Sequence, residues 1–209
     1  MLDILDTQQT NRPQREVANR HLILETAIRL GTENGWQKLT VRNLASELHY
    51  APPVLYQFFK NKEDLMKAIV KNGFDQLKTE PQKALDAYSK PSDQIFAFAK
   101  ARYRFATENS ALHALMFSPG SPEWHRQILS ENIRSTHHTI HGLLKTLSGR
   151  TDNCNDLVLN LICIIKGYTF FTTEIYKTRH KKEIIGNLEP SDEFDGAIVR
   201  FIKAIQSDE

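Results

Sequence analysis

The sequence has little cysteine, proline and glycine, and it has no long hydrophobic run. Among 209 residues there are two cysteines, eight prolines and nine glycines. Two thiols are too few for a disulfide framework or a four-cysteine zinc site. The longest apolar stretch, residues 157–165, contains Asn160 and is followed by Lys166, so it falls short of the roughly 20 residues that cross a bilayer. The first residues show no basic segment before an apolar core. We therefore predict a cytoplasmic protein with no secretory signal and no membrane segment.

Short motifs of the common enzyme classes are also missing. The chain has no phosphate-binding loop, dinucleotide fingerprint or nucleophile elbow. His137 and His141 are four residues apart on a predicted helix and could share a metal ion, but no third ligand is evident. Cys154 and Cys163 are nine apart and are expected on opposite sides of a helix, so they should not pair. We predict no enzyme activity, no metal and no cofactor. A sensing role for these histidines or cysteines stays open.

Charge is distributed unevenly along the chain. Residues 12–62 contain eight basic and four acidic side chains, whereas residues 63–209 contain 19 of each sign. A basic first quarter suits binding to a polyanion such as DNA, and a random fluctuation is the alternative. The composition, with 40% hydrophobic and 25% charged residues, is that of a globular protein.

The hydrophobic pattern has a helical period throughout and predicts an all-α fold. Two helix ends carry capping signals. Gly35 follows a helix that ends at Asn34, with Trp36 placed to fold back onto the last turn, and Thr40 precedes a helix that starts at Val41. A polar arm, residues 1–14, comes first. The predicted helices are residues 15–34, 41–48, 52–59, 62–79, 91–108, 110–117, 123–147, 152–177 and 191–206.

Residues 40–62 contain two short helices, each with an apolar inner face, as a helix-turn-helix requires. The inner residues are Val41, Leu44 and Leu48 of the first helix and Val54, Leu55, Phe58 and Phe59 of the second, with Ala45 as the small residue between them. The residues left on the outer face are Pro52, Pro53, Tyr56, Gln57 and Lys60. Such a polar, aromatic and basic face fits a helix in the major groove. An ordinary helical hairpin with a solvated face is the alternative.

The run from Trp36 to Leu65 resembles the amino-terminal DNA-binding domain of the tetracycline-repressor (TetR) family. It reads WQKLTVRNLASELHYAPPVLYQFFKNKEDL. The shared features are the aromatic residue after the glycine, the Thr-Val opening, the Leu-Ala and Leu-Tyr pairs and the Phe-x-x-Lys-x-x-Leu entry into the next helix. The stretch Ala101–Phe117 resembles the ligand-domain class of this family named for a Trp-His-Gly signature, with Lys166-Gly167 at the place of that signature.

This resemblance implies a homodimeric bacterial transcriptional regulator, most often a repressor, that a small molecule releases from DNA. It implies a helix-turn-helix domain over residues 15–62 and a ligand-binding and dimerisation domain over residues 63–209. The family's phosphate-contacting threonine maps to Thr40, and its tyrosine and lysine map to Tyr56 and Lys62. Arg42 is a candidate for a bidentate pair with guanine. The predicted DNA-binding set is Thr40, Arg42, Ala51, Pro52, Pro53, Tyr56, Gln57, Lys60 and Lys62.

Three positions depart from the family pattern. Phe58 replaces a residue that is often histidine or tyrosine, which removes a polar contact. His49 replaces the glycine usual in the turn, where the backbone commonly needs a positive φ; histidine tolerates that conformation better than most residues. Ala51 replaces the usual serine or threonine cap, so one cap or phosphate contact is missing.

The resemblance also implies a cavity and a dimer interface in the second domain. The cavity would take a mainly apolar ligand, with Arg102, His113 or Lys166 among its polar groups. The residues predicted to line it are Phe98, Arg102, Phe105, Met116, Phe117, Trp124, His137 and Tyr168. The residues predicted at the interface with a second copy are Leu157, Leu161, Ile164, Phe171, Ile198, Phe201, Ile202 and Ile205. Burial within the chain's own core is the alternative for each of these residues.

A symmetric dimer would match a palindromic DNA operator. Two other functions stay open at this point. One is a DNA-anchored protein-interaction module without a small-molecule effector, and the other is a helical enzyme or carrier whose first domain is structural.

Overall fold

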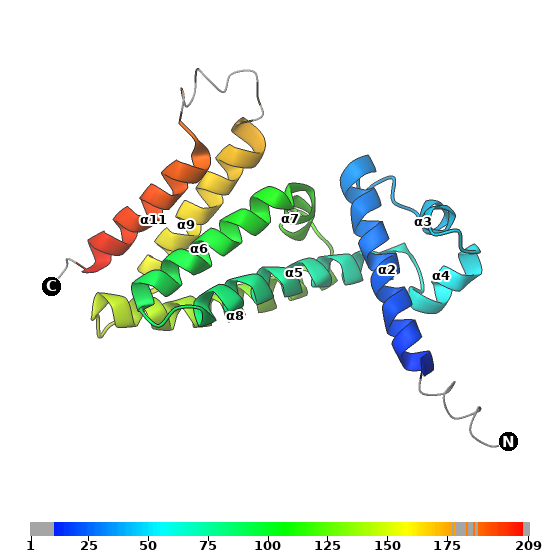
Figure 1. Cartoon of the computed structure of the whole chain (residues 1–209), viewed down its shortest axis with the longest axis horizontal. Coiled ribbons are helices and arrows are strands. Elements are labelled where there is room, and N and C mark those ends of the chain that lie inside the picture. Colours follow the sequence, from blue (N-terminus) through cyan, green and yellow to red (C-terminus); the bar gives the residue numbers. More distant parts are fainter. Residues whose placement is uncertain (1–10, 177, 179–182, 184–185, 187, 207–209) are drawn as a thin grey trace. The chain divides into compact units, whose positions relative to one another are not determined.

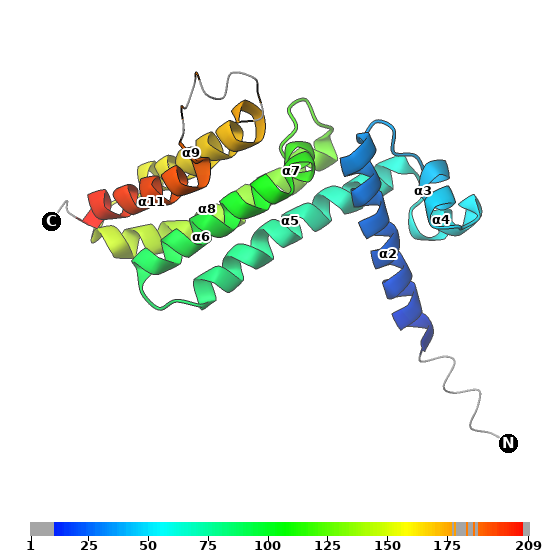
Figure 2. The same cartoon turned by 45° about the horizontal axis from the view of Figure 1, so that its top comes forward.

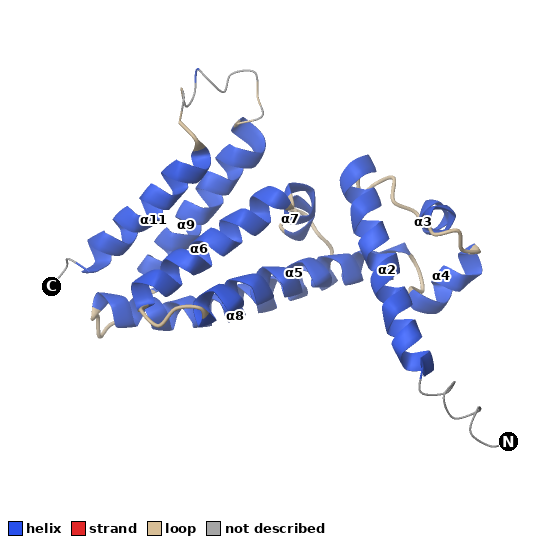
Figure 3. Cartoon of the chain, viewed as in Figure 1, coloured by secondary structure: helices blue, strands red, loops and turns tan. Residues whose placement is uncertain are grey.

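The structure is a computed structural model that describes residues 11–176, 178, 183, 186 and 188–206. Every regular element in these residues is a helix (Figure 3), which confirms the predicted all-α class. The chain forms two compact units that divide between Asn72 and Gly73. Residues 1–10 of the expected arm, and Lys177 at the end of one predicted helix, lie outside the described residues.

The first unit contains α2 (Asn11–Asn34), α3 (Val41–Glu47), α4 (Pro52–Phe58) and the beginning of α5 (Lys62–Asp86). Helix α2 starts four residues earlier than predicted, because Pro13 falls in its first turn, where backbone amides have no helical partner. The buried apolar residues of this unit are Ile23, Ala27, Leu39, Leu44, Ala45, Leu55, Phe59, Leu65, Ile69 and Val70.

The boundary between the units lies ten residues beyond the predicted position at residue 62. The cause is the first half of α5, where Leu65, Ile69 and Val70 are buried and belong to the first unit. Helix α5 therefore contributes to both units.

The second unit contains the rest of α5 and the elements α6 (Pro91–Glu108), α7 (Ser110–Met116), α8 (Glu123–Ser148), α9 (Asn155–Phe170), η1 (Phe171–Ile175) and α11 (Pro190–Gln206). Helix α6 packs against α8, α9 and α11. Helices α9 and α11 lie side by side in both views (Figures 1 and 2). The largest fully buried side chains of this unit are Ile95, Met116, Ile140, Leu144, Leu161 and Phe194.

Two further predicted helices differ from the structure at their ends. Helix α5 was expected to stop at Thr79, but it continues through Pro81 to Asp86. Proline removes one backbone hydrogen bond, yet Leu77, Pro81 and Leu85 are all buried on one helical face, and this burial maintains the helix. The helix predicted over residues 152–177 starts at Asn155, and it changes after Phe170 into the π-helical turn η1.

The segment Asn155–Ile175, which spans α9 and η1, is long and apolar enough to cross a membrane by length and composition, with a mean hydropathy of 1.3. We predicted no membrane segment from the sequence because its longest apolar stretch is only nine residues, 157–165. Length and composition are weak evidence, because core helices of other proteins meet the same test.

Candidate functional site

The start of α3 is fixed by a reciprocal cap. The Thr40 hydroxyl accepts a hydrogen bond from the Asn43 amide at 3.1 Å, and the Asn43 side-chain oxygen accepts one from the Thr40 amide at 2.8 Å. Asn43 also donates to the carbonyl of Lys38 at 2.6 Å. This capping box satisfies amides that the helix leaves without partners, and it confirms the predicted cap at Thr40.

The turn between α3 and α4 has the backbone that the sequence comparison led us to expect. His49 has a φ of 55°, in the left-handed region where glycine is usual. Ala51 makes no side-chain cap, and Pro52 and Pro53 open α4, where the missing amide hydrogens matter least. The resulting α4 has Leu55 buried and Tyr56 52% exposed.

The entry into α5 is held by a second set of polar contacts. The Asn61 side-chain oxygen accepts a hydrogen bond from the Asp64 amide at 2.8 Å, which caps the start of α5. The Lys62 ammonium donates to the carbonyl of Gln37 at 3.1 Å, so α5 is tied to the loop before α3.

Helix α2 is joined to the carboxyl end of α4 by one arginine. Arg20 donates to the carbonyl of Phe58 at 2.7 Å, and its guanidinium lies 4.4 Å from the centre of the Phe59 ring. The guanidinium thus donates a hydrogen bond to a carbonyl that the end of a short helix leaves without a helical partner.

All nine residues predicted to bind DNA are exposed in this unit. They come from the start of α3, from α4 with its flanking turns, and from the start of α5. The residues are Thr40, Arg42, Ala51, Pro52, Pro53, Tyr56, Gln57, Lys60 and Lys62.

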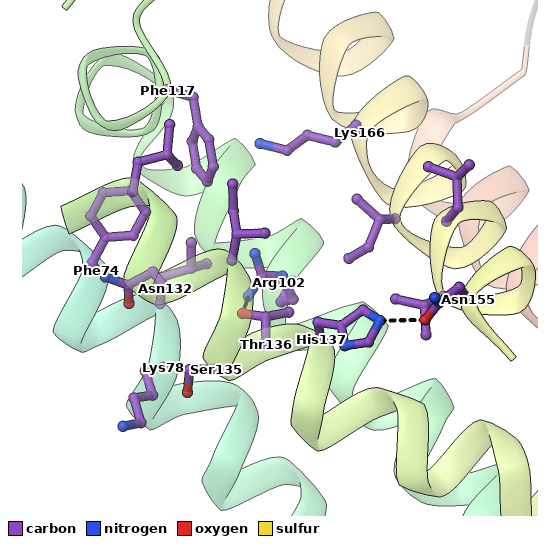
Figure 4. A pocket seen from close by; sticks show the side chains of 16 residues that line it. Phe74, Lys78, Arg102, Phe117, Asn132, Ser135, Thr136, His137, Asn155 and Lys166 are labelled. Atoms are coloured by element: carbon purple, nitrogen blue, oxygen red, sulfur yellow. Dashed lines mark hydrogen bonds between the residues drawn. The ribbon is translucent and has the colours of Figure 1, made fainter. Parts of the chain in front are cut away.

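A cavity of about 530 Å³ lies in the second unit, between α5, α6, α8 and α9. Its size is typical of a small-molecule site. Of the predicted lining, Arg102, Phe117 and His137 face it (Figure 4). Exposed Lys78, Ile133 and Leu159 are also part of its wall, so the cavity reaches solvent there.

The other predicted cavity residues lie elsewhere. Phe98, Phe105 and Met116 are buried in the core. Trp124 is partly exposed and is not part of the wall. Tyr168 instead lines a separate groove of about 520 Å³ formed around α9, η1 and the start of α11. The sequence analysis assigned mainly aromatic residues to the cavity wall. Most of these rings pack elsewhere, because a large aromatic side chain buries the most apolar area inside a core.

Sequence reasoning missed the residues by which α8 and α9 line the cavity. On α8 the lining residues recur at helical spacing, as do those on α9, so the missing signal was a periodic face on each helix. These residues are Leu129, Asn132, Ile133, Ser135, Thr136, Asn155, Val158, Leu159 and Ile162.

Two basic side chains project into the cavity from different helices (Figure 4). Burial lowers the pKa of Arg102, on α6, to about 10. Burial, followed by the charge of Arg102, lowers the pKa of Lys166, on α9, to about 8. Desolvation and the two cations lower the pKa of His113 to about 3. At neutral pH the arginine and lysine are therefore charged, and the histidine is neutral.

Among the described residues, no carboxylate contacts these groups. Lys166 Nζ lies 3.4 Å from Nε2 of His113 and 3.1 Å from the centre of the Phe117 ring. Arg102 donates to the Thr136 hydroxyl at 3.4 Å. Because lysine only donates, the neutral histidine accepts from it.

The predicted dimer interface needs correction. Five of its residues are buried in the chain's own core, with at most 8% exposure, because they face the neighbouring helices of the same unit. They are Leu157, Leu161, Ile198, Ile202 and Ile205. Of the rest, Ile164 and Phe201 are half-buried and Phe171 is 42% exposed.

Exposed apolar side chains do exist on the same elements. Phe170 and Phe171 are 54% and 42% exposed, and Val199 on α11 is 39% exposed. Cys163 on α9 is exposed as well. These four residues are called the outer face below.

The histidines and cysteines make ordinary contacts. His137 lies 2.7 Å from the amide oxygen of Asn155, and its ring stacks on that of His141 at 5.4 Å. Cys154 is buried and Cys163 exposed, and both are free thiols. In the described part of the chain, no three potential metal ligands come together.

Comparisons with known proteins agree with this arrangement. The family model of bacterial regulatory proteins of the tetR family matches residues 23–69. The HTH-type transcriptional regulator HbdR of Aromatoleum sp. (strain CIB) is 25% identical over 83 residues, which cover 40% of this chain and 36% of that protein. The match thus spans about a third of the length of this curated relative.

Solved structures share the fold over nearly the whole chain. A TetR/AcrR-family transcriptional regulator from Thermobifida fusca YX-ER1 has a TM-score of 0.66 and 20% identity, covering 91% of this chain and 97% of its own. AibR, solved with isovaleryl coenzyme A and operator DNA, has a TM-score of 0.64 and 16% identity, covering 87% and 96%. At these identities the likeness shows the fold alone. The chain thus carries, over residues 23–69, a segment that matches the tetR-family model, within a fold that solved TetR-family regulators share.

Proposed function

We propose that this protein binds a palindromic DNA operator as a homodimer, that it acts as a cytoplasmic repressor, and that a small molecule in the cavity releases it. The observation that carries the DNA-binding part is the exposed set of nine residues around α4. Tyr56, Lys60 and Lys62 are exposed to solvent in the monomer. The phosphates and base edges of a DNA duplex would cover them.

Each part of this surface has a chemical task in the proposal. Lys62 and Thr40 lie at helix starts and suit phosphate oxygens, which fix the register of the protein on the duplex. Arg42 and Gln57 are exposed and can reach base edges, where they carry sequence information. The prolines Pro52 and Pro53 offer apolar contact to a thymine methyl group.

The outer face supports the dimer. Four exposed apolar side chains on adjacent helices are costly to hydrate, and a second copy would cover them by two-fold symmetry. Phe171→Asp should convert the dimer to a monomer in analytical ultracentrifugation and weaken operator binding. Tyr88→Asp replaces an equally exposed aromatic residue, 50% accessible between α5 and α6, and should leave the dimer intact.

Ligand release would act through α5. This helix begins in the first unit and lines the cavity through Phe74, Leu77 and Lys78. A ligand that favours one position of α5 would change the spacing of the two recognition helices, which operator half-sites hold about 34 Å apart. The ligand can shift this balance only by the difference in its affinity for the two states.

A salt titration tests the DNA-binding part. Operator fragments can be selected from genomic DNA and their affinity measured by gel shift over a range of salt. Lys62→Ala should weaken binding to all sequences and reduce the log–log salt slope by about one, and Tyr56→Phe should weaken binding to the operator. The control Lys90→Ala removes an exposed lysine of the second unit. If Tyr56→Phe and Lys62→Ala bind as tightly as the wild type, this surface is not the one that contacts DNA.

The family and the fold are those of transcriptional regulators, not of enzymes. The alternative is a DNA-anchored interaction module without an effector. Such a module needs no ligand cavity, so it predicts that no small molecule binds there. A thermal-shift screen of small molecules distinguishes the two.

A further inference from the structure

The cavity wall is positively charged as well as apolar. Among its lining residues are Lys78, Arg102 and Lys166, and none of the lining residues in the described part of the chain is acidic. Most of the remaining wall is aliphatic or aromatic. A ligand that matches this wall has an apolar body and a negative charge.

Arg102 and Lys166 are unusual among the basic residues of this chain because they are partly buried without a carboxylate partner. Arg29 pairs with Glu33 and Glu47 on the surface, and Arg150 pairs with Asp152 and Asp156. In the described residues no ion pair involves Arg102 or Lys166. Their partners are a hydroxyl, a neutral imidazole and aromatic rings.

A cation that loses water without gaining an opposite charge destabilises the fold. Two such cations at one cavity destabilise it further, since they repel each other, and the pKa of Lys166 is lowered partly by Arg102. A bound anion would remove both penalties. The guanidinium can bind two carboxylate oxygens side by side, and the ammonium can donate a further hydrogen bond.

We propose that the cavity binds an amphipathic carboxylate, with the carboxylate held by Arg102 and Lys166 and the apolar body along the α8 and α9 wall. This inference rests on the proposed function only in taking the cavity to be the effector site.

The geometry also predicts how the affinity changes with pH. Lys166 faces Arg102 from α6 and His113 from α7, and Lys78 and His137 line the same cavity from α5 and α8. Because the pKa of Lys166 is lowered to about 8, its charge is lost as the pH rises through that value. Carboxylate affinity should therefore fall above pH 8, and Lys166→Arg should delay the fall.

The test compares acids with their uncharged counterparts by titration calorimetry. The probes are hexanoate, decanoate and phenylacetate, each paired with the matched alcohol. We expect at least one acid to bind about tenfold or more tightly than its alcohol. Lys166→Met and Arg102→Gln should each reduce acid affinity by roughly 10- to 100-fold, because a charge-assisted hydrogen bond is lost. Alcohol affinity should change by less than about threefold.

A second readout separates this ligand contact from a structural one. If Lys166 and Arg102 only supported the fold, their variants would melt at a lower temperature than the wild type. Because both are cations without a carboxylate partner, we expect instead that replacing them leaves the melting temperature of the ligand-free protein unchanged or raises it. Lys145→Met, an exposed residue of α8 outside the cavity, is the control.

Three results would overturn the proposal: acids and alcohols that bind equally, variants that lose both equally, or no acid that binds. The same probes, and a coenzyme A thioester of decanoate, are then added to operator complexes in gel shifts. If acids bind but do not release DNA, the effector part of the proposed function fails while this inference stands. If only neutral molecules, or only the thioester, bind and release DNA, the inference fails while the proposed function stands.

Discussion

The Thr40 side chain has two proposed functions, capping α3 and contacting DNA, and substitutions at this position can separate them. Its hydroxyl oxygen accepts the Asn43 amide, and its hydroxyl hydrogen is free to point outward to a phosphate. Thr40→Ala loses both interactions. The missing cap should lower the free energy of unfolding by about 1 kcal/mol, which corresponds to a fall in melting temperature of roughly 3 °C for a chain of this size.

Thr40→Asp should separate the two effects. Aspartate is a good N-cap and its charge suits the helix start, so stability should match the wild type. Next to a phosphate, however, the carboxylate cannot donate and repels, so operator affinity should fall by roughly 10- to 100-fold. Thr40→Ser retains both groups and serves as the control.

The assays are thermal denaturation and operator gel shifts on the same preparations. If Thr40→Asp binds the operator as tightly as the wild type, Thr40 does not contact a phosphate. If the aspartate variant is as unstable as the alanine variant, the Thr40 hydroxyl does not stabilise the fold as a cap.

Three further predictions concern stability. Gly31→Ala places a methyl group 2.2 Å from ring carbons of Trp36, so the indole must move. Denaturant titration should show that the free energy of unfolding falls by about 1–3 kcal/mol. The control Gly142→Ala, where nothing lies within 4 Å of the added methyl group, should be neutral or stabilising. His49→Gly relieves a positive φ and should stabilise by up to about 1 kcal/mol; a clear loss would mean that the imidazole makes a contact of its own. Arg150 lowers the pKa of its two aspartate partners below the ordinary 3.8, so its pairing stabilises the fold above that pH and is lost as the pH falls through the lowered values. The stability difference between wild type and Arg150→Gln should therefore disappear in acid unfolding, and a difference that persists there would contradict the assignment.

Local signals in the sequence predicted the first unit well. A threonine before a short apolar helix, a glycine after a long one and a double proline each fix a few residues of backbone. The structure places Gly35 at a φ of 89° and His49 at 55°, as expected. These features depend on neighbours in the chain, so they can be predicted from the sequence alone.

The second unit was harder because its features depend on contacts between distant helices. Helix α5 continues through Pro81 because one of its faces is buried, which no local rule includes. Leu161 and Ile198 lie in the monomer core rather than on the outer face. A wide apolar stripe shows that a helix is covered on several sides, but it does not show which side faces its own chain.

Pro81 has a mechanical consequence for α5. It is the single residue of this helix without an amide hydrogen to donate, and it comes after the cavity-lining residues Phe74, Leu77 and Lys78. The most compliant turn therefore lies beyond the cavity, while the stretch that leads from Lys62 to the cavity wall retains its complete donor set. In the proposed ligand release, a ligand that moves Leu77 would therefore act on a part of α5 in which every backbone amide can donate.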